Sequence, residues 1–84
     1  MNIFVAKLNY RTAEPALRSL FEQYGTVDTV KIVMDRETGR SKGYGFIEMP
    51  NDDEARAAIE GLNASNFDGR DIVVKRSEPR RPSR

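Results

Sequence analysis

Hydrophobic residues repeat with a helical period in two parts of this chain. In the first part, the apolar positions fall at i, i+3, i+4 and i+7, on one face of a helix: Leu17, Leu20, Phe21 and Tyr24. We expect Thr12 to cap this helix, Pro15 to lie in its first turn and Gly25 to end it. The spacing favours packing of Phe21 and Tyr24 against a sheet.

The second helical pattern repeats the same spacing in a later part of the chain: Ala55, Ala58, Ile59 and Leu62. Asn51 stands at the expected N-cap, and Glu54 follows at the position that would complete a pair resembling a capping box. Acidic residues at 52–54 crowd the first turn, where the helix dipole favours negative charge. The dipole explains these carboxylates without an acidic active site.

Apolar and polar positions alternate elsewhere with a period of two, which is the pattern of half-buried strands. We expect strands at 2–8, 27–34 and 42–49, and a last strand in which Ile72 and Val74 point inward. The polar loop 35–41 is expected to be long and flexible and to join two antiparallel strands. Asp68-Gly69 is expected to form a turn.

The segment 42–49 separates two kinds of side chain. One face carries Lys42, Tyr44, Phe46 and Glu48, and the other carries Gly43, Gly45, Ile47 and Met49. Two aromatic rings and a lysine on the face away from the core are suited to stacking bases and holding a phosphate. The two glycines leave room for another element to pack closely against the backbone.

The order of these elements is βαββαβ, which predicts an α+β, ferredoxin-like fold. Two amphipathic helices would cover one face of a four-stranded antiparallel sheet and leave the other face open. The residues expected on the open face are Phe4, Ala6, Lys31, Val33, Lys42, Tyr44, Phe46, Glu48, Val73 and Lys75.

Composition excludes several classes of protein. The 84 residues include no Cys and no His, which excludes a disulfide framework, a thiol nucleophile, a Cys/His zinc site and a Ser-His-Asp triad. The first residues resemble neither a signal peptide nor a membrane span. We therefore expect a cytoplasmic, monomeric protein with no membrane attachment, no cofactor, no metal and no enzyme activity.

Charge divides the chain unequally. Residues 1–74 carry nine Lys or Arg and twelve Asp or Glu, a net charge of −3, whereas residues 75–84 carry five and one, a net charge of +4. The overall charge of +1 therefore does not by itself indicate a nucleic-acid partner. We expect one domain at 1–77 and a disordered basic tail at 78–84, which would add affinity for polyanions, direct localisation or only aid solubility.

The motifs of the chain resemble a known family. Residues 42–49 fit the longer motif of the RNA recognition motif, K/R-G-F/Y-G/A-F-V-x-F/Y, except that Met49 replaces the last aromatic residue. Residues 2–8 resemble the shorter motif, with Phe4 as its aromatic residue and Lys7 where the family usually has Asn. The run Leu20-Phe21-Glu22-Gln23-Tyr24-Gly25 and the loop at 35–43 are also typical of the family. The chain is similar to small one-domain bacterial RNA-binding proteins and to plant glycine-rich RNA-binding proteins.

This resemblance implies a function and a set of site residues. Phe4 and Tyr44 would each stack on a base, Phe46 would lie beside a pair of sugars, and Lys42 would contact a phosphate. Further basic candidates are Lys7, Lys31, Arg40 and Lys75. The implied partner is single-stranded RNA or single-stranded DNA.

Two questions stay open at this point. The same fold and the same exposed rings would also suit a module that binds another protein. Glu48 shares the face of the aromatic residues, where it would repel a phosphate, pair with a lysine or accept a hydrogen bond from a base.

Overall fold

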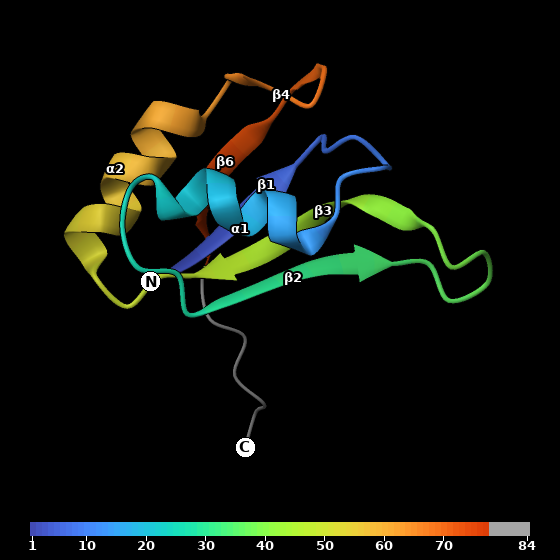
Figure 1. Cartoon of the computed structure of the whole chain (residues 1–84), viewed down its shortest axis with the longest axis horizontal. Helices are drawn as coiled ribbons and strands as arrows, with labels where there is room; N and C mark the ends of the chain where they lie inside the picture. Colours follow the sequence, from blue (N-terminus) through green and yellow to red (C-terminus); the bar gives the residue numbers. More distant parts are fainter. Residues whose placement is uncertain (78–84) are drawn as a thin grey trace.

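The computed structural model describes residues 1–77 as an α+β fold. Its elements are β1 (Asn2–Ala6), α1 (Glu14–Glu22), β2 (Thr29–Met34), β3 (Ser41–Glu48), α2 (Asp52–Leu62), β4 (Asn66–Phe67), β5 (Arg70–Asp71) and β6 (Val73–Ser77). Four strands form a sheet in the order β2-β3-β1-β6, and the helices cover one face of it (Figure 1). The ferredoxin-like fold expected from the sequence is confirmed. The basic tail expected at 78–84 lies outside the described residues.

Strand register aligns the side chains of the sheet into rows. All three strand pairs are antiparallel, and Phe4 in β1 lies opposite Phe46 in β3 and Lys75 in β6. On the far side of β3, Lys31 in β2 lies opposite Phe46. Because residues directly opposite one another point to the same face, the register forms a row that runs Lys31, Phe46, Phe4, Lys75 across all four strands.

The core lies between the sheet and the helices. The largest fully buried side chains are Phe21, Ile3, Leu8, Leu17, Ile47, Met49, Ile72, Val5 and Val74. Met49 is 0% exposed, so the replacement of the usual aromatic residue there concerns packing, as its inward position predicts. Leu20, Tyr24 and Ile59 are only partly buried at the edge of this core. The helical stripes were therefore assigned to the correct side of each helix, but not every member is enclosed.

The start and end of α1 differ from the sequence-based expectation. Ala13 is the N-cap and makes no side-chain capping bond, and the helix ends at Glu22, before Gly25. Thr12 does not cap the helix, because its Oγ1 donates a hydrogen bond of 2.7 Å to Asp68 Oδ2. Pro15 does lie in the first turn, where its missing N–H costs nothing.

Asn51 caps α2 as expected, but the Glu54 side chain does not complete the expected capping pair. The backbone N–H of Glu54 donates to Asn51 Oδ1 at 3.0 Å. The Glu54 carboxylate does not return a bond to Asn51; instead its Oε1 accepts from the backbone N–H of Thr26 at 3.1 Å. A side chain on Gly25 would collide with the Glu54 carboxylate. The absence of a side chain at Gly25 therefore leaves room for Glu54 of α2 to hydrogen-bond the turn that follows α1.

A small hairpin precedes the last strand. Asp68 and Gly69 form the expected turn with φ values of 54° and 85°, a conformation that Asp tolerates and Gly adopts freely. The turn connects β4 and β5, which form a separate two-stranded sheet that was not predicted. The Thr12–Asp68 bond ties this hairpin to the loop between β1 and α1.

Candidate nucleic-acid interface

Three aromatic rings form a cluster on the sheet face opposite the helices. The ring centroid of Phe4 lies 5.8 Å from that of Tyr44 and 5.5 Å from that of Phe46, and Tyr44 and Phe46 are 6.3 Å apart. Phe46 is 40% exposed, an unusual value for phenylalanine, and Phe4 and Tyr44 are partly exposed. We call these three rings the aromatic surface. Their adjacency follows from the pairing of β1 with β3.

Lysine side chains flank the aromatic surface on both sides. Lys75 Nζ lies 5.5 Å from the centroid of the Phe4 ring, within the range of a cation–π contact. Lys31 stands opposite Phe46 at the other end of the row. Both lysines are exposed. The register therefore brings together two apolar rings and two positive charges that are distant in the sequence.

Two glycines let β3 take its path beside the aromatic residues. A side chain on Gly45 would meet the backbone carbonyl oxygen of Lys31 and lie 3.1 Å from the Cα of Ile32. Gly43 has a φ of 86°, and the register between β2 and β3 shifts there, between Ile32 and Met34. The close packing expected at the glycines is present, and at Gly45 the close neighbour is the adjacent strand.

Lys7 occupies a backbone conformation that is uncommon for lysine. It directly follows β1, has a φ of 61° and is exposed. Asn tolerates this left-handed region better than other residues with a side chain, apart from Asp. The Asn usual in the family at this position thus has a conformational reason, and Lys7 replaces it with a positive charge.

The Glu48 side chain is hydrogen-bonded to a residue of the neighbouring strand β2 and not to a lysine. Its Oε1 accepts a hydrogen bond of 3.0 Å from Thr29 Oγ1, and the register places Thr29, Glu48 and Asn2 in the next row of the sheet. The carboxylate is exposed at the end of the aromatic surface that lies nearer α2. It would repel a phosphate that came close to this end.

Lys42 and Arg40 lie at the opposite end of the aromatic surface, beside a groove. The groove has a volume of about 570 Å³ and is lined by Tyr10, Asp35, Thr38, Arg40, Ser41, Lys42 and Tyr44. We call it the end groove. Tyr10 is 63% exposed and was not singled out in the sequence, because it lies in an irregular loop outside every periodic pattern.

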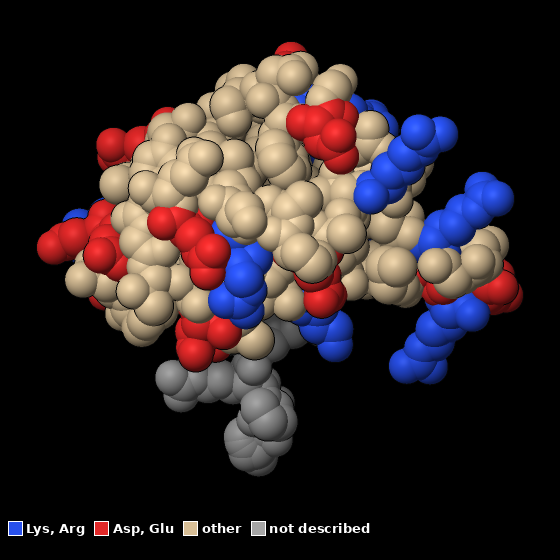
Figure 2. All heavy atoms as spheres, viewed as in Figure 1, with Lys and Arg blue, Asp and Glu red and all other residues tan. Residues whose placement is uncertain are grey.

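Charge is distributed unevenly over the helical face. In the view of Figure 2, acidic side chains gather on the side of α2, whereas several Lys and Arg side chains project near the loop between β2 and β3, beside the acidic side chains of that loop. The first turn of α2 alone holds Asp52, Asp53 and Glu54. This separation makes the helical side near α2 a poor surface for a polyanion, and the end near Arg40 a better one.

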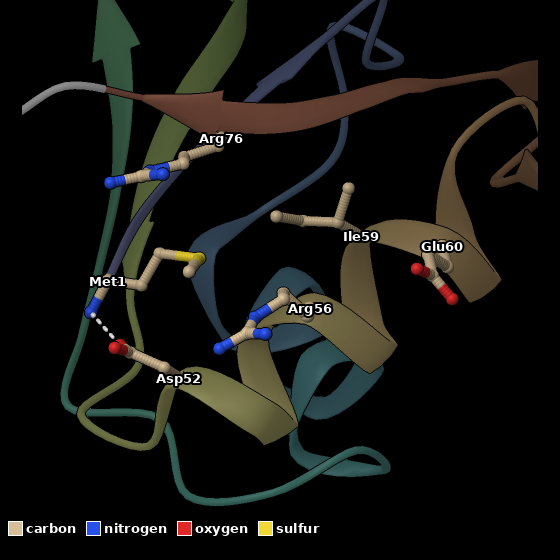
Figure 3. A pocket seen from close by; sticks show the side chains of 6 residues that line it. All are labelled: Met1, Asp52, Arg56, Ile59, Glu60 and Arg76. Atoms are coloured by element: carbon tan, nitrogen blue, oxygen red, sulfur yellow. Dashed lines mark ion pairs between the residues drawn. The ribbon is translucent and has the colours of Figure 1, made fainter.

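A second hollow lies beside α2 and has a mixed lining. Its volume is about 440 Å³, and Figure 3 shows Asp52 and Arg56 from α2 together with Arg76 from β6. The Met1 amine lies 3.6 Å from Asp52 Oδ1. Charges of both signs neutralise one another across this hollow, and none of its lining residues is aromatic. It lacks the features that stack a base.

The described part of the chain contains neither a cluster of metal-binding side chains nor a membrane-spanning helix. Among residues 1–77, no three acidic side chains gather into a group that could hold a metal ion. No helix within the same range is long and apolar enough to cross a membrane.

Known proteins are similar to this chain in sequence. The protein named "Putative RNA-binding protein RbpB" of Nostoc sp. is 45% identical over 80 residues, which are 95% of this chain and 78% of RbpB. The glycine-rich RNA-binding protein blt801 of Hordeum vulgare is 44% identical over 78 residues, 93% of this chain and 48% of that protein.

Solved structures extend the likeness to three dimensions. The crystal structure of RNA-binding protein PG1 superposes with a TM-score of 0.92 at 48% identity and covers 98% of this chain and 99% of that one. The RRM of Rna15 with bound RNA (GU) has a TM-score of 0.83 at 28% identity, over 93% and 83% of the two chains. The family model described as "RNA recognition motif" matches residues 3–73. The chain therefore belongs to the RNA recognition motif family.

Proposed function

We propose that this protein binds single-stranded RNA on the aromatic surface. Phe4 and Tyr44 each stack on a base, and Phe46 lies against the sugars between them. The observation that carries the proposal is the cluster of three mutually contacting, solvent-accessible rings on the sheet face opposite the helices. Such rings offer flat contact area at little entropic cost, and stacking is worth about 1–3 kcal/mol per base. The relatives named as RNA-binding proteins support the same class of partner.

Basic side chains around the rings hold the phosphates in this proposal. Lys31 and Lys75 flank the aromatic surface in one row of the sheet, and Lys42 and Arg40 lie at one end. Lys7 is exposed at the end of β1 and adds a further charge. A backbone that crosses the sheet would therefore meet cations on either side of the stacked bases.

The proposal also covers the binding domain, its oligomeric state and its location in the cell. Residues 1–77 act as one binding domain, as a monomer in the cytoplasm and without catalysing a reaction. Single-stranded DNA has the same stackable bases and phosphates, and it would bind the same surface unless the 2′-hydroxyl is recognised.

Titration of the protein with unstructured RNA tests the proposal. The chain has three Tyr and no Trp, so tyrosine fluorescence reports on Tyr44 alone when Tyr10 and Tyr24 are replaced by Phe. We expect quenching on addition of single-stranded RNA and a loss of about 1–3 kcal/mol of binding free energy in Tyr44→Ala. Tyr44→Phe is the matched control, because it removes a hydroxyl and keeps the ring.

Three results of these experiments would contradict the proposal. Equal affinity of the native protein and a folded Tyr44→Ala/Phe46→Ala variant would overturn base stacking. Binding of fully paired RNA as tightly as single strands would also contradict it, because paired bases cannot lie on the rings. No binding of any RNA would favour the protein-binding use of the same apolar surface.

A further inference from the structure

The end groove continues from the aromatic surface. Tyr44 and Lys42 belong to both: Tyr44 is one of the three rings, and both side chains line the groove. A strand that leaves the sheet at Tyr44 in this direction meets the groove next, because Tyr44 also lines it. The remaining lining comes from the β1–α1 loop, through Tyr10, and from the end of the β2–β3 hairpin.

The Tyr10 ring contacts neighbouring residues but remains exposed to solvent. The Arg70 guanidinium lies 5.8 Å from the centroid of the Tyr10 ring, and Cε1 of the ring is 3.2 Å from the position that a Cβ of Gly43 would take. A side chain at 43 would push the ring away. Despite these contacts Tyr10 is 63% exposed, more than any other large hydrophobic residue of the described chain.

The loop that carries Tyr10 is fastened at several points. Asn9 Nδ2 donates to the backbone oxygen of Asp68 at 3.0 Å, and Thr12 Oγ1 donates to Asp68 Oδ2 at 2.7 Å. The backbone N–H of Arg11 also donates to Asn9 Oδ1 at 2.9 Å. These bonds join the loop to the β4–β5 hairpin, which also supplies Arg70. The ring is thus held in place before any ligand arrives, which lowers the entropic cost of stacking on it.

Charge in the groove favours a nucleotide over an apolar ligand. Arg40 and Lys42 supply two exposed cations that suit a phosphate. Asp35 is the acid among the lining residues, and its Oδ1 accepts from the backbone N–H of Glu37 at 2.8 Å within the loop. A flat aromatic ring with two cations nearby matches a base and its phosphate.

We propose that the end groove is a subsite for one further nucleotide of the same RNA, with its base on Tyr10 and its phosphate on Arg40 and Lys42. This inference rests on the proposed function, because the nucleotide reaches the groove only when its neighbours occupy the aromatic surface. The subsite lengthens the bound segment beyond the two or three bases that the sheet aromatics of this family stack.

Oligonucleotides lengthened by one nucleotide at a time test the subsite. For the native protein we expect affinity to keep rising after the aromatic surface is filled, and Tyr10→Ala to abolish that last increment. The loss is about 5- to 150-fold, the range of one stacked base. Oligonucleotides that fill only the aromatic surface should bind both proteins alike, and Tyr10→Phe should bind like the native protein because it keeps the ring.

The hairpin loop offers a matched pair of arginines. Arg36 and Arg40 are both exposed in the same loop, but only Arg40 lines the groove. Arg40→Ala should weaken binding of the longer oligonucleotides more than Arg36→Ala does. Equal losses in the two variants would mean that the loop attracts RNA only through its general charge, and would overturn the phosphate contact.

Fluorescence gives an independent readout of Tyr10. In a Tyr24→Phe/Tyr44→Phe background, Tyr10 is the remaining tyrosine, and quenching by the longer RNA reports contact with its ring. Absence of quenching at saturation, or equal affinity of Tyr10→Ala and native protein at every length, would overturn the subsite while the aromatic surface still binds. Loss of all RNA binding by the native protein would instead remove the proposed function, and the subsite with it.

Discussion

Gly45 in β3 lies against the backbone of Lys31 in β2, so closely that a side chain at 45 would meet the Lys31 carbonyl oxygen. The contact lies immediately beside the pair of Lys31 and Phe46, and Phe46 is one of the three rings of the aromatic surface. The glycine therefore sets the distance between the two strands at the point where the candidate RNA site begins. The same position is the fourth in the RNA recognition motif pattern, which has Gly or Ala there; in this chain the Lys31 carbonyl oxygen leaves no room for the methyl group of Ala.

The first prediction follows from this contact. Gly45→Ala should lower the free energy of unfolding by about 1–3 kcal/mol, because the added methyl group forces the strands apart. A urea titration measures the loss. Hydrogen exchange should show the loosening in the β2–β3 pair, with the β1–β6 pair as an internal control. Equal acceleration in both pairs, or an unchanged stability, would contradict the steric role of Gly45.

The second prediction compares two leucines on α1. Leu17 is 0% exposed, whereas Leu20 is only partly buried at the edge of the core. Leu17→Ala should cost about 2–5 kcal/mol of stability through lost burial and a cavity. The same change at Leu20 should cost distinctly less, because solvent already reaches its side chain. Comparable losses at the two positions in urea would show that Leu20 is enclosed in solution.

The helical and strand periods of the sequence predict the fold and most of the open face correctly. A period of two places Phe4, Tyr44 and Phe46 on the same side of their strands before any pairing is known. The stripe of α1 likewise identifies its inward side, although which members are fully buried depends on how far the sheet extends beneath the helix. Periodicity therefore predicts on which face of an element a residue lies, but not how deeply its side chain is buried.

Contacts between distant loops carry no such periodic signal. Thr12 looks like a helix cap in the sequence, but its partner Asp68 is 56 residues away. Tyr10 lies in the same loop and owes its fixed position to Arg70 and Gly43. The bond from Thr29 to Glu48 also depends on strand register, which the sequence leaves open. These features appear only when the chain is folded.

The third prediction concerns the left-handed conformation of Lys7, whose φ is 61°. Lys7→Gly should raise stability by about 0.5–1 kcal/mol, because glycine adopts this region without steric cost. Lys42→Gly is the matched control. Lys42 lies within β3, where the same change should lower stability by about 0.5–1 kcal/mol. A loss of stability in Lys7→Gly comparable to that in Lys42→Gly would contradict the conformational argument.

The last prediction concerns the salt dependence of RNA binding. Each phosphate contact on a single strand contributes about −0.7 to the slope of log K against log salt. If stacking carries much of the affinity, as proposed, the basic residues around the rings need to contact only two or three phosphates, which gives a slope of about −1.5 to −2. Lys31→Ala or Lys42→Ala should flatten it by about 0.7 each. Arg56→Ala is the control, since Arg56 lies on α2, 3.5 Å from Asp53. A slope that changes as much in Arg56→Ala as in Lys42→Ala would mean that net charge, and not placement beside the aromatic surface, governs the attraction.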